Sequence, residues 1–169
     1  FCNAGFDILG TTDHTFVSLT GYSRNIWLNI VIMLLIILGG IGFLTWEDFY
    51  TNKFKFKRYR MQSKVILITT AILIIAPAVF FFACDFGNLP AGKRLLASVF
   101  QSVTTRTAGF NTEDLSLMTE AGKAVMILLM LIGGSPSSTA GGMKTTTFAV
   151  LILNALATFR SREDAGAFG

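Results

Sequence analysis

Residues 133–144 read Gly-Gly-Ser-Pro-Ser-Ser-Thr-Ala-Gly-Gly-Met-Lys, and this stretch separates two apolar runs, residues 118–132 and 148–159. Because an α-helix rises ~1.5 Å per residue, neither run alone covers the ~30 Å hydrocarbon core of a bilayer, whereas the two joined through the break do. Unwound backbone at membrane depth is tolerated only where it is buried in protein or lines an aqueous cavity. The break loop, as we call residues 133–144, therefore predicts a transport pathway with a flexible segment lying across it.

The composition favours an all-α membrane protein over a soluble domain. Hydrophobic residues make up 52% of the 169 residues and charged residues only 14%. The apolar residues come in blocks of membrane-spanning length. The two cysteines, Cys2 and Cys84, lack a metal-like spacing and are interpreted as ordinary thiols. Since the chain starts at Phe1 and stops soon after a predicted helix, we interpret it as a fragment of a longer polypeptide.

Basic residues are concentrated in one short loop. Six of the fourteen lie there: Lys53, Lys55, Lys57, Arg58, Arg60 and Lys64. Aromatic residues lie among them, as in proteins that stack on single-stranded nucleic acid. Between two membrane spans, however, the positive-inside rule explains the cluster more simply. The loop is therefore predicted to be cytoplasmic, with no nucleic-acid partner.

This orientation sets the order of the predicted elements. A first span over 25–46 runs inward and a second over 63–84 runs outward. Residues 93–102 predict a helix too short to cross, followed by a polar, extended return segment, residues 103–110. A short helix that enters and a polar stretch that returns are typical of a re-entrant pore loop. The broken span over 118–159 then leads back inside.

A weak internal repeat supports this topology. Residues 4–7, Ala-Gly-Phe-Asp, recur as Ala-Gly-Phe-Asn at 108–111, and the apolar residues 33–40, ending in Gly-Gly, resemble residues 127–134. Weak internal symmetry is usual in transporters, whose binding sites lie where the repeats meet. The repeat unit is predicted to be span, pore helix, filter and span.

Gly109 and, by the repeat, Gly5 each end a polar stretch. Potassium filters replace the hydration shell of the ion with backbone carbonyls, and aiming successive carbonyls inward needs conformations that glycine adopts readily. A glycine in a surface turn is the plainer alternative. The short helix before Gly109 and the recurrence of its tetrapeptide favour the filter.

The motifs at 1–7, 104–112 and 133–147 also carry a family resemblance. They resemble the Trk/Ktr/HKT superfamily of cation transporters, and above all the bacterial membrane subunit of Ktr and Trk potassium uptake systems. The resemblance implies four repeats around one pore, with a gating loop in the third. It implies filter carbonyls, the K⁺ sites, at Cys2, Asn3, Ala4, Gly5, Arg106, Thr107, Ala108 and Gly109. It implies a gate that includes Gly133, Gly134, Ser135, Ser138, Gly141, Gly142 and Lys144. Cys2 departs from the pattern, in which a second Asn is expected.

The same resemblance implies a division of the chain. Residues 1–46 would end one pore repeat, 47–62 form a cytoplasmic basic loop, 63–160 make up the complete next repeat, and 161–169 form a cytoplasmic tail. It further implies a homodimer, lipid around it, a cytosolic ring of nucleotide-binding regulatory subunits, and a multi-pass location in the bacterial inner membrane. No cofactor is expected. Potassium uptake down the electrical gradient is the predicted function, and a sodium-permeable relative stays an alternative.

Two enzyme-like interpretations fail on their patterns. Lys144 follows Met143 and no strand precedes it, so it is not a phosphate-binding lysine. It is expected either to donate to carbonyls freed by the break or to set a field that opposes resting cations. The serines of the break loop lack the Gly-x-Ser-x-Gly pattern, and the only histidine, His14, has no helix to present it at membrane depth. The chain is therefore predicted not to be an enzyme.

Charged residues near the predicted pore have structural interpretations. Arg106 should direct its guanidinium behind the filter rather than toward permeating cations. Asp85, Glu113 and Asp114 lie near the predicted outer mouth, where a solvated rim is favoured over cation attraction.

Overall fold

The computed structural model describes residue 5 and residues 18–52 and 56–159 of the chain. Within those ranges the regular elements are helices joined by turns and loops, with one isolated β-bridge between Ile132 and Met143. The helices are α1 (Ile26–Ile41), α2 (Phe43–Asn52), α3 (Met61–Cys84), α4 (Ala91–Thr104), α5 (Glu120–Leu131) and α6 (Thr145–Phe159). Three short 3₁₀ turns accompany them: Thr20–Tyr22 precedes α1, Phe56–Arg58 lies between α2 and α3, and Leu115–Leu117 lies between α4 and α5.

The first predicted span is not a single helix. α1 begins after Asn25, whose Oδ1 accepts a hydrogen bond from the Leu28 N–H at 3.2 Å. It ends at Ile41, and α2 leaves at 95° after Gly42. Gly42 has φ +87°, a left-handed conformation that residues with a Cβ rarely adopt. The predicted helix over 25–46 was therefore wrong beyond residue 41, and Trp46 lies on α2 rather than at the inner end of the span.

A single helix, α3, lies where the second span is predicted. It has 24 residues, and among the described helices it alone is long and apolar enough by itself to cross a membrane; the bent α1–α2 pair passes the same test only when taken together. Pro77 lies inside it and cannot donate to the Leu73 carbonyl one turn earlier. The Ser102 hydroxyl of α4 lies at this point, donating to the Ile74 carbonyl at 2.6 Å with the Leu73 oxygen at 3.4 Å. The proline therefore marks where the short helix docks.

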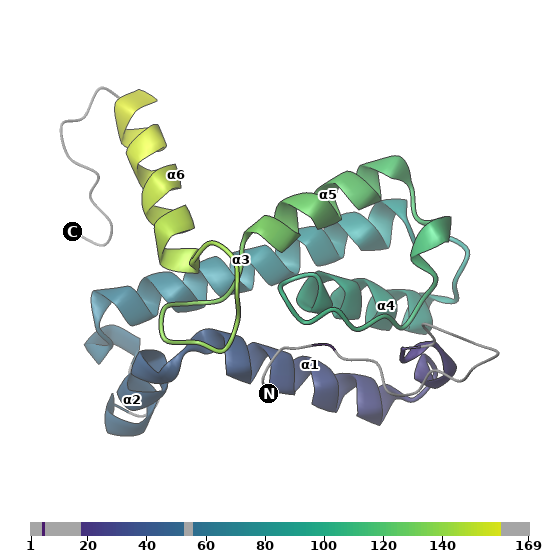
Figure 1. Ribbon diagram of the computed structural model, residues 1–169, viewed down its shortest axis with the longest axis horizontal. Coiled ribbons are helices and arrows are strands. Elements are labelled where there is room, and N and C mark those ends of the chain that lie inside the picture. The colour runs from purple at the N-terminus through teal and green to yellow at the C-terminus, as the bar shows by residue number, and fades with distance from the viewer. Residues whose placement is uncertain (1–4, 6–17, 53–55, 160–169) are drawn as a thin grey trace.

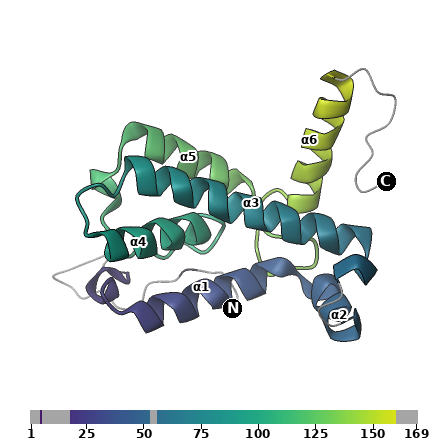
Figure 2. The ribbon, with the colours of Figure 1, turned by 180° about the vertical axis from the view of Figure 1, so that it is seen from behind.

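The short helix α4 lies between α1 on one side and α3 and α5 on the other (Figure 1). Two apolar clusters enclose it. The first joins α3, α4 and α5 around Phe81, and the second joins α1 and α4 around Phe100, both side chains being fully buried. The last turns of α4 are buried on every side, from Phe100 to Thr104. A helix too short to cross is thus held inside the protein, and α3 runs past it along the length of the molecule (Figure 2).

Two helices, α5 and α6, separated by the break loop, lie where the broken span is predicted. α6 does not continue the line of α5. It leaves the layer formed by α3, α4 and α5 and rises away from it (Figure 1). The expectation that the two helices continue one another across a bilayer therefore does not hold for this arrangement.

Candidate functional site

The return segment begins in the last turn of α4 and is tighter than the extended stretch that the sequence predicts. The N–H groups of Ala108 and Gly109 both donate to the Thr104 carbonyl, at 3.0 and 3.2 Å. The Thr104 hydroxyl accepts from the Phe110 N–H at 2.9 Å and donates to the Phe110 carbonyl at 2.7 Å. One threonine thus holds both ends of the turn, and residues 105–108 form a turn instead of an extended strand.

Two residues of this turn have left-handed backbone conformations. Thr107 has φ +73° and Gly109 has φ +78°, while Ala108 between them does not have a positive φ. A non-glycine residue at positive φ costs about 1–2 kcal/mol and persists only where its surroundings impose it. A cavity of about 390 Å³ opens beside the segment, lined in part by Thr104, Thr107 and Gly109.

Gly5 brings the preceding repeat to the same place. It has φ +60°, and a Cβ on it would overlap the Ala108 carbonyl oxygen and lie 3.2 Å from the Gly109 Cα. The two glycines that the internal repeat pairs therefore lie side by side in the structure. Cys2, Asn3 and Ala4 fall outside the described residues.

The Arg106 side chain joins the return segment to the break loop. Its side chain is buried, and its Nη2 donates to the Gly133 carbonyl at 3.2 Å. Gly133 follows Ile132, the C-cap of α5, so its carbonyl has no helical partner of its own. The guanidinium thus links the end of α4 to the helix break.

The break loop closes at its base. The Gly133 N–H donates to the Met143 carbonyl at 2.9 Å, and the Met143 N–H donates to the Leu131 carbonyl at 3.0 Å. A Cβ at Gly133 would collide with the Gly141 carbonyl, so the two strands of the base approach too closely for any other residue. Lys144 Nζ donates to the Ala140 carbonyl at 2.9 Å, which matches the first of its two expected roles.

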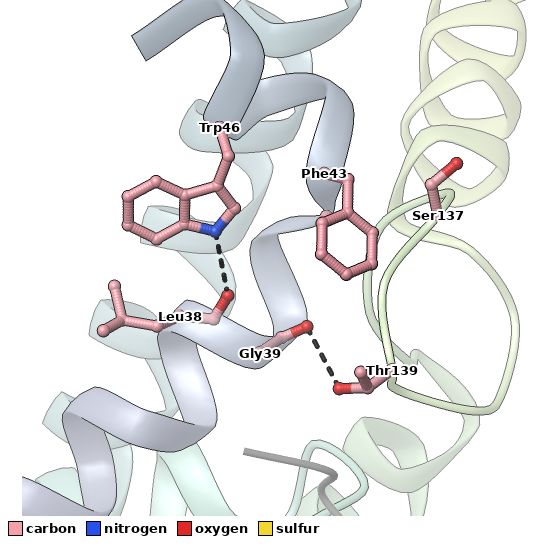
Figure 3. A pocket seen from close by; sticks show the side chains of 7 residues that line it. Leu38, Gly39, Phe43, Trp46, Ser137 and Thr139 are labelled. Carbon is pink, nitrogen blue, oxygen red and sulfur yellow. Dashed lines mark hydrogen bonds between the residues drawn. The ribbon is translucent and has the colours of Figure 1, made fainter. Parts of the chain in front are cut away.

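The tip of the break loop lies against the corner between α1 and α2. Ser135 is fully buried, and its N–H and Oγ both donate to the Gly40 carbonyl, at 3.0 and 2.8 Å. Thr139 donates from its N–H and Oγ1 to the Gly39 carbonyl, at 3.3 and 3.2 Å (Figure 3). Ser138, by contrast, accepts only from the Ala140 N–H within the loop, at 3.4 Å. The tip of the break loop is therefore held by hydrogen bonds to the last turn of α1.

Thr139 and Gly42 are absent from the predicted site, although the structure places both at this contact. The signal for Gly42 was available in the sequence, because Gly39-Gly40-x-Gly42 stands where the repeat aligns it with the Gly-Gly of the break. The signal for Thr139 was not, because nothing local distinguishes it from its hydroxyl-bearing neighbours.

The acidic residues of the predicted outer mouth all have protein partners. Asp85 Oδ1 accepts from the Thr119 N–H and hydroxyl, at 2.9 and 2.7 Å, and Glu113 pairs with Lys93 at 2.8 Å. Asp114 accepts from the Ser116 N–H at 2.9 Å, and hydrogen bonding with Ser116 lowers the pKa of its carboxyl. Among the described residues, no cluster of three or more His, Cys, Asp or Glu side chains is arranged to hold a metal ion. These carboxylates therefore cap and join elements.

Comparison with known proteins places this geometry in a family. A sequence profile named TrkH and described as "Cation transport protein" matches residues 1–167. The chain is 40% identical to the potassium/sodium uptake protein NtpJ of Enterococcus hirae, over all of the chain and 37% of that protein. It is 35% identical to the Ktr system potassium uptake protein B of Bacillus subtilis, over 97% of the chain and 37% of that protein. It is 37% identical to the Ktr system potassium uptake protein D of the same organism, over 93% of the chain and 34% of that protein.

The fold is also similar to that of a solved structure. The crystal structure of the potassium transporter TrkH from Vibrio parahaemolyticus matches with a TM-score of 0.73 and 17% sequence identity, covering 94% of this chain and 33% of that one. The chain therefore spans about a third of the length of the proteins that it matches.

Proposed function

The chain belongs to the TrkH family of cation transport proteins, and from that premise we propose that it forms part of the potassium pathway of a bacterial inner-membrane transporter. The family is one of integral membrane transport proteins, so the chain stands among transporters rather than enzymes. Because it spans about a third of its relatives, the activity belongs to the whole protein, of which these residues are two adjoining parts of the pore.

The observation that carries the proposal is the meeting of Gly5 with the turn at Ala108 and Gly109. Both glycines have left-handed backbones, both end a polar segment, and they come from two copies of the same repeat. In the proposed pore the carbonyls of residues 106–109 and of residues 2–5 replace water around K⁺. A cation entering a negative interior gains ~2.3 kcal/mol per 100 mV, so uptake down the electrical gradient needs no further source of energy.

The break loop is the proposed gate. Its base lies at the end of α5, where the Arg106 side chain joins it to the return segment. The loop therefore lies next to the proposed filter in space, although α5 separates the two in the sequence. Glycines at the base allow close approach of its two strands, and Lys144 supports it by donating to the Ala140 carbonyl.

Sodium is the second candidate ion. NtpJ is named for both potassium and sodium uptake. The observed geometry does not separate the two ions, because backbone carbonyls bind either. The ratio of their uptake rates is consequently the quantity to measure.

The partners follow from the relatives' names. Two relatives are named as proteins B and D of a Ktr system, which points to a transporter built from more than one kind of subunit. We infer a homodimeric membrane subunit bound to a cytosolic ring of nucleotide-binding regulatory subunits, through the side that carries the basic loop.

The test is Gly109→Ser in the full-length protein. A Cβ at Gly109 meets only the Gly5 Cα at 3.9 Å, so the cost is backbone strain of about 1–2 kcal/mol rather than a clash, and the variant should fold. We expect reduced discrimination of potassium over sodium, measured as isotope uptake of each ion in cells that lack other potassium transporters. Gly92→Ser is the matched control, because a Cβ there meets nothing within 4 Å. An unchanged uptake ratio in Gly109→Ser would refute the filter.

A further inference from the structure

The end of α1 exposes four carbonyls that no later turn of the helix can use. All four have partners. The Leu38 oxygen accepts from Trp46 Nε1 of α2 at 3.2 Å, and the Gly39 oxygen accepts from Thr139 (Figure 3). The Gly40 and Ile41 oxygens both accept from Ser135. The break loop therefore supplies the cap for three of the four carbonyls.

The contact is reciprocal. The first N–H of α2, that of Phe43, donates to the Ser137 carbonyl of the loop at 3.2 Å. A Cβ at Gly42 would lie 2.5 Å from the Pro136 carbonyl oxygen and 2.7 Å from Ser135 Oγ. The bend and the loop thus fit together only because residue 42 has no side chain. The hydrogen bonds between the corner and the loop are lost if either element moves away.

From this capping we propose that the corner between α1 and α2 holds the gate closed, with Ser135 and Thr139 as the positioning residues. We call this contact the catch. While their donors cap α1, the break loop stays as it is seen here. To conduct, the loop leaves the corner and releases those carbonyls. The inference rests on the proposed function of the break loop as the gate and adds what holds it closed.

The capping hydrogen bonds stabilise the closed arrangement of the loop but not the open one, and this difference makes the catch testable. When the loop leaves, the freed carbonyls of α1 face the aqueous cavity that the loop vacates, and water replaces the lost donors. Removing the Ser135 hydroxyl therefore weakens the closed arrangement and leaves the open one unchanged. The net contribution of one hydrogen bond corresponds to a two- to tenfold shift of the closed-to-open equilibrium.

The first experiment measures rubidium flux into proteoliposomes that contain the full-length protein. Ser135→Ala and Thr139→Val should each raise the flux two- to tenfold and leave the potassium-to-sodium ratio unchanged. Ser137→Ala is the matched control, since its side chain is exposed and it contributes only its backbone carbonyl to the contact. Flux that falls or stays unchanged in both variants would overturn the catch.

The second experiment locks the catch. Phe43 and Ser137 are joined by a backbone hydrogen bond and line the same pocket of about 360 Å³ (Figure 3), so Phe43→Cys with Ser137→Cys should form a disulfide under oxidant. We expect the crosslinked protein to lose most of its flux and to regain it with a reductant. Each single-cysteine variant under the same oxidant controls for the natural cysteines.

The outcomes separate the catch from the filter. A pair that crosslinks and still conducts, or that does not crosslink at all, overturns the catch. In either case Gly109→Ser still tests the filter, because its readout is the ratio of two ions rather than the total flux. If Gly109→Ser changes the ion ratio while the variants of the catch do not change the flux, the proposed function stands without the catch.

Discussion

Gly122→Ala at the outer end of the molecule sets two opposing effects against each other. Gly122 lies in the first turns of α5, where alanine is favoured over glycine by about 1 kcal/mol. A Cβ at this position, however, would lie 2.4 Å from Asp85 Oδ2 and 2.5 Å from Oδ1. The carboxylate cannot simply swing away, because its Oδ1 holds the Thr119 N–H and hydroxyl at 2.9 and 2.7 Å.

The sizes of the two effects decide whether Gly122→Ala raises or lowers the free energy of unfolding. Displacing the carboxylate loses two charge-assisted hydrogen bonds, about 1.5 kcal/mol each, against the gain of about 1 kcal/mol from helix propensity. Gly122→Ala should therefore lower the free energy of unfolding by about 2 kcal/mol. In an Asp85→Ala background the obstacle is gone, and the same substitution should raise it by about 1 kcal/mol.

The assay is the midpoint temperature at which the detergent-solubilised full-length protein is lost from its size-exclusion peak. Gly122→Ala should lower the midpoint alone and raise it when Asp85 is already alanine. Gly92→Ala is the control, since a Cβ there has open space and should leave the midpoint unchanged or slightly raised. The same sign in both backgrounds would refute the reasoning that the Asp85 carboxylate decides the outcome.

Three further changes test the links around the pore. Arg106→Gln keeps a donor for the Gly133 carbonyl and should retain more potassium uptake than Arg106→Met; equal loss in both would rule out the hydrogen bond as the reason. Asp48→Ala removes the acceptor that joins α2 to the start of α3, and it should lower the free energy of unfolding by about 2 kcal/mol. Its midpoint temperature should therefore fall further than that of Asp48→Asn. Cysteines at the exposed Lys57 and Asn88 should label from opposite sides of the membrane with an impermeant thiol reagent, and labelling of both from outside would overturn the proposed orientation.

Local features of the sequence predicted much of the architecture. The long helix α3, the short helix α4 and the break between α5 and α6 follow from the lengths of apolar runs and the positions of glycines. These properties depend on neighbours within a few turns, which is the range that a periodic pattern reports. The left-handed backbone at Gly109 was predictable for the same reason, since the residue type itself permits it.

Hydrogen bonds between segments far apart in the sequence decided the features that local patterns did not predict. Residues 25–46 carry no charged side chain, and nothing local forces the 95° bend after Ile41. The bend is stable because the Ser135 hydroxyl, 95 residues further along the chain, caps the carbonyl of Gly40. Thr107 likewise has a left-handed backbone that its residue type disfavours, inside the turn that is closed by hydrogen bonds between Thr104 and residues 108–110. The sequence by itself determined where the helices form and break, whereas the tertiary structure decided how each break is capped, because an orphan carbonyl can be satisfied by any donor that the fold brings within reach.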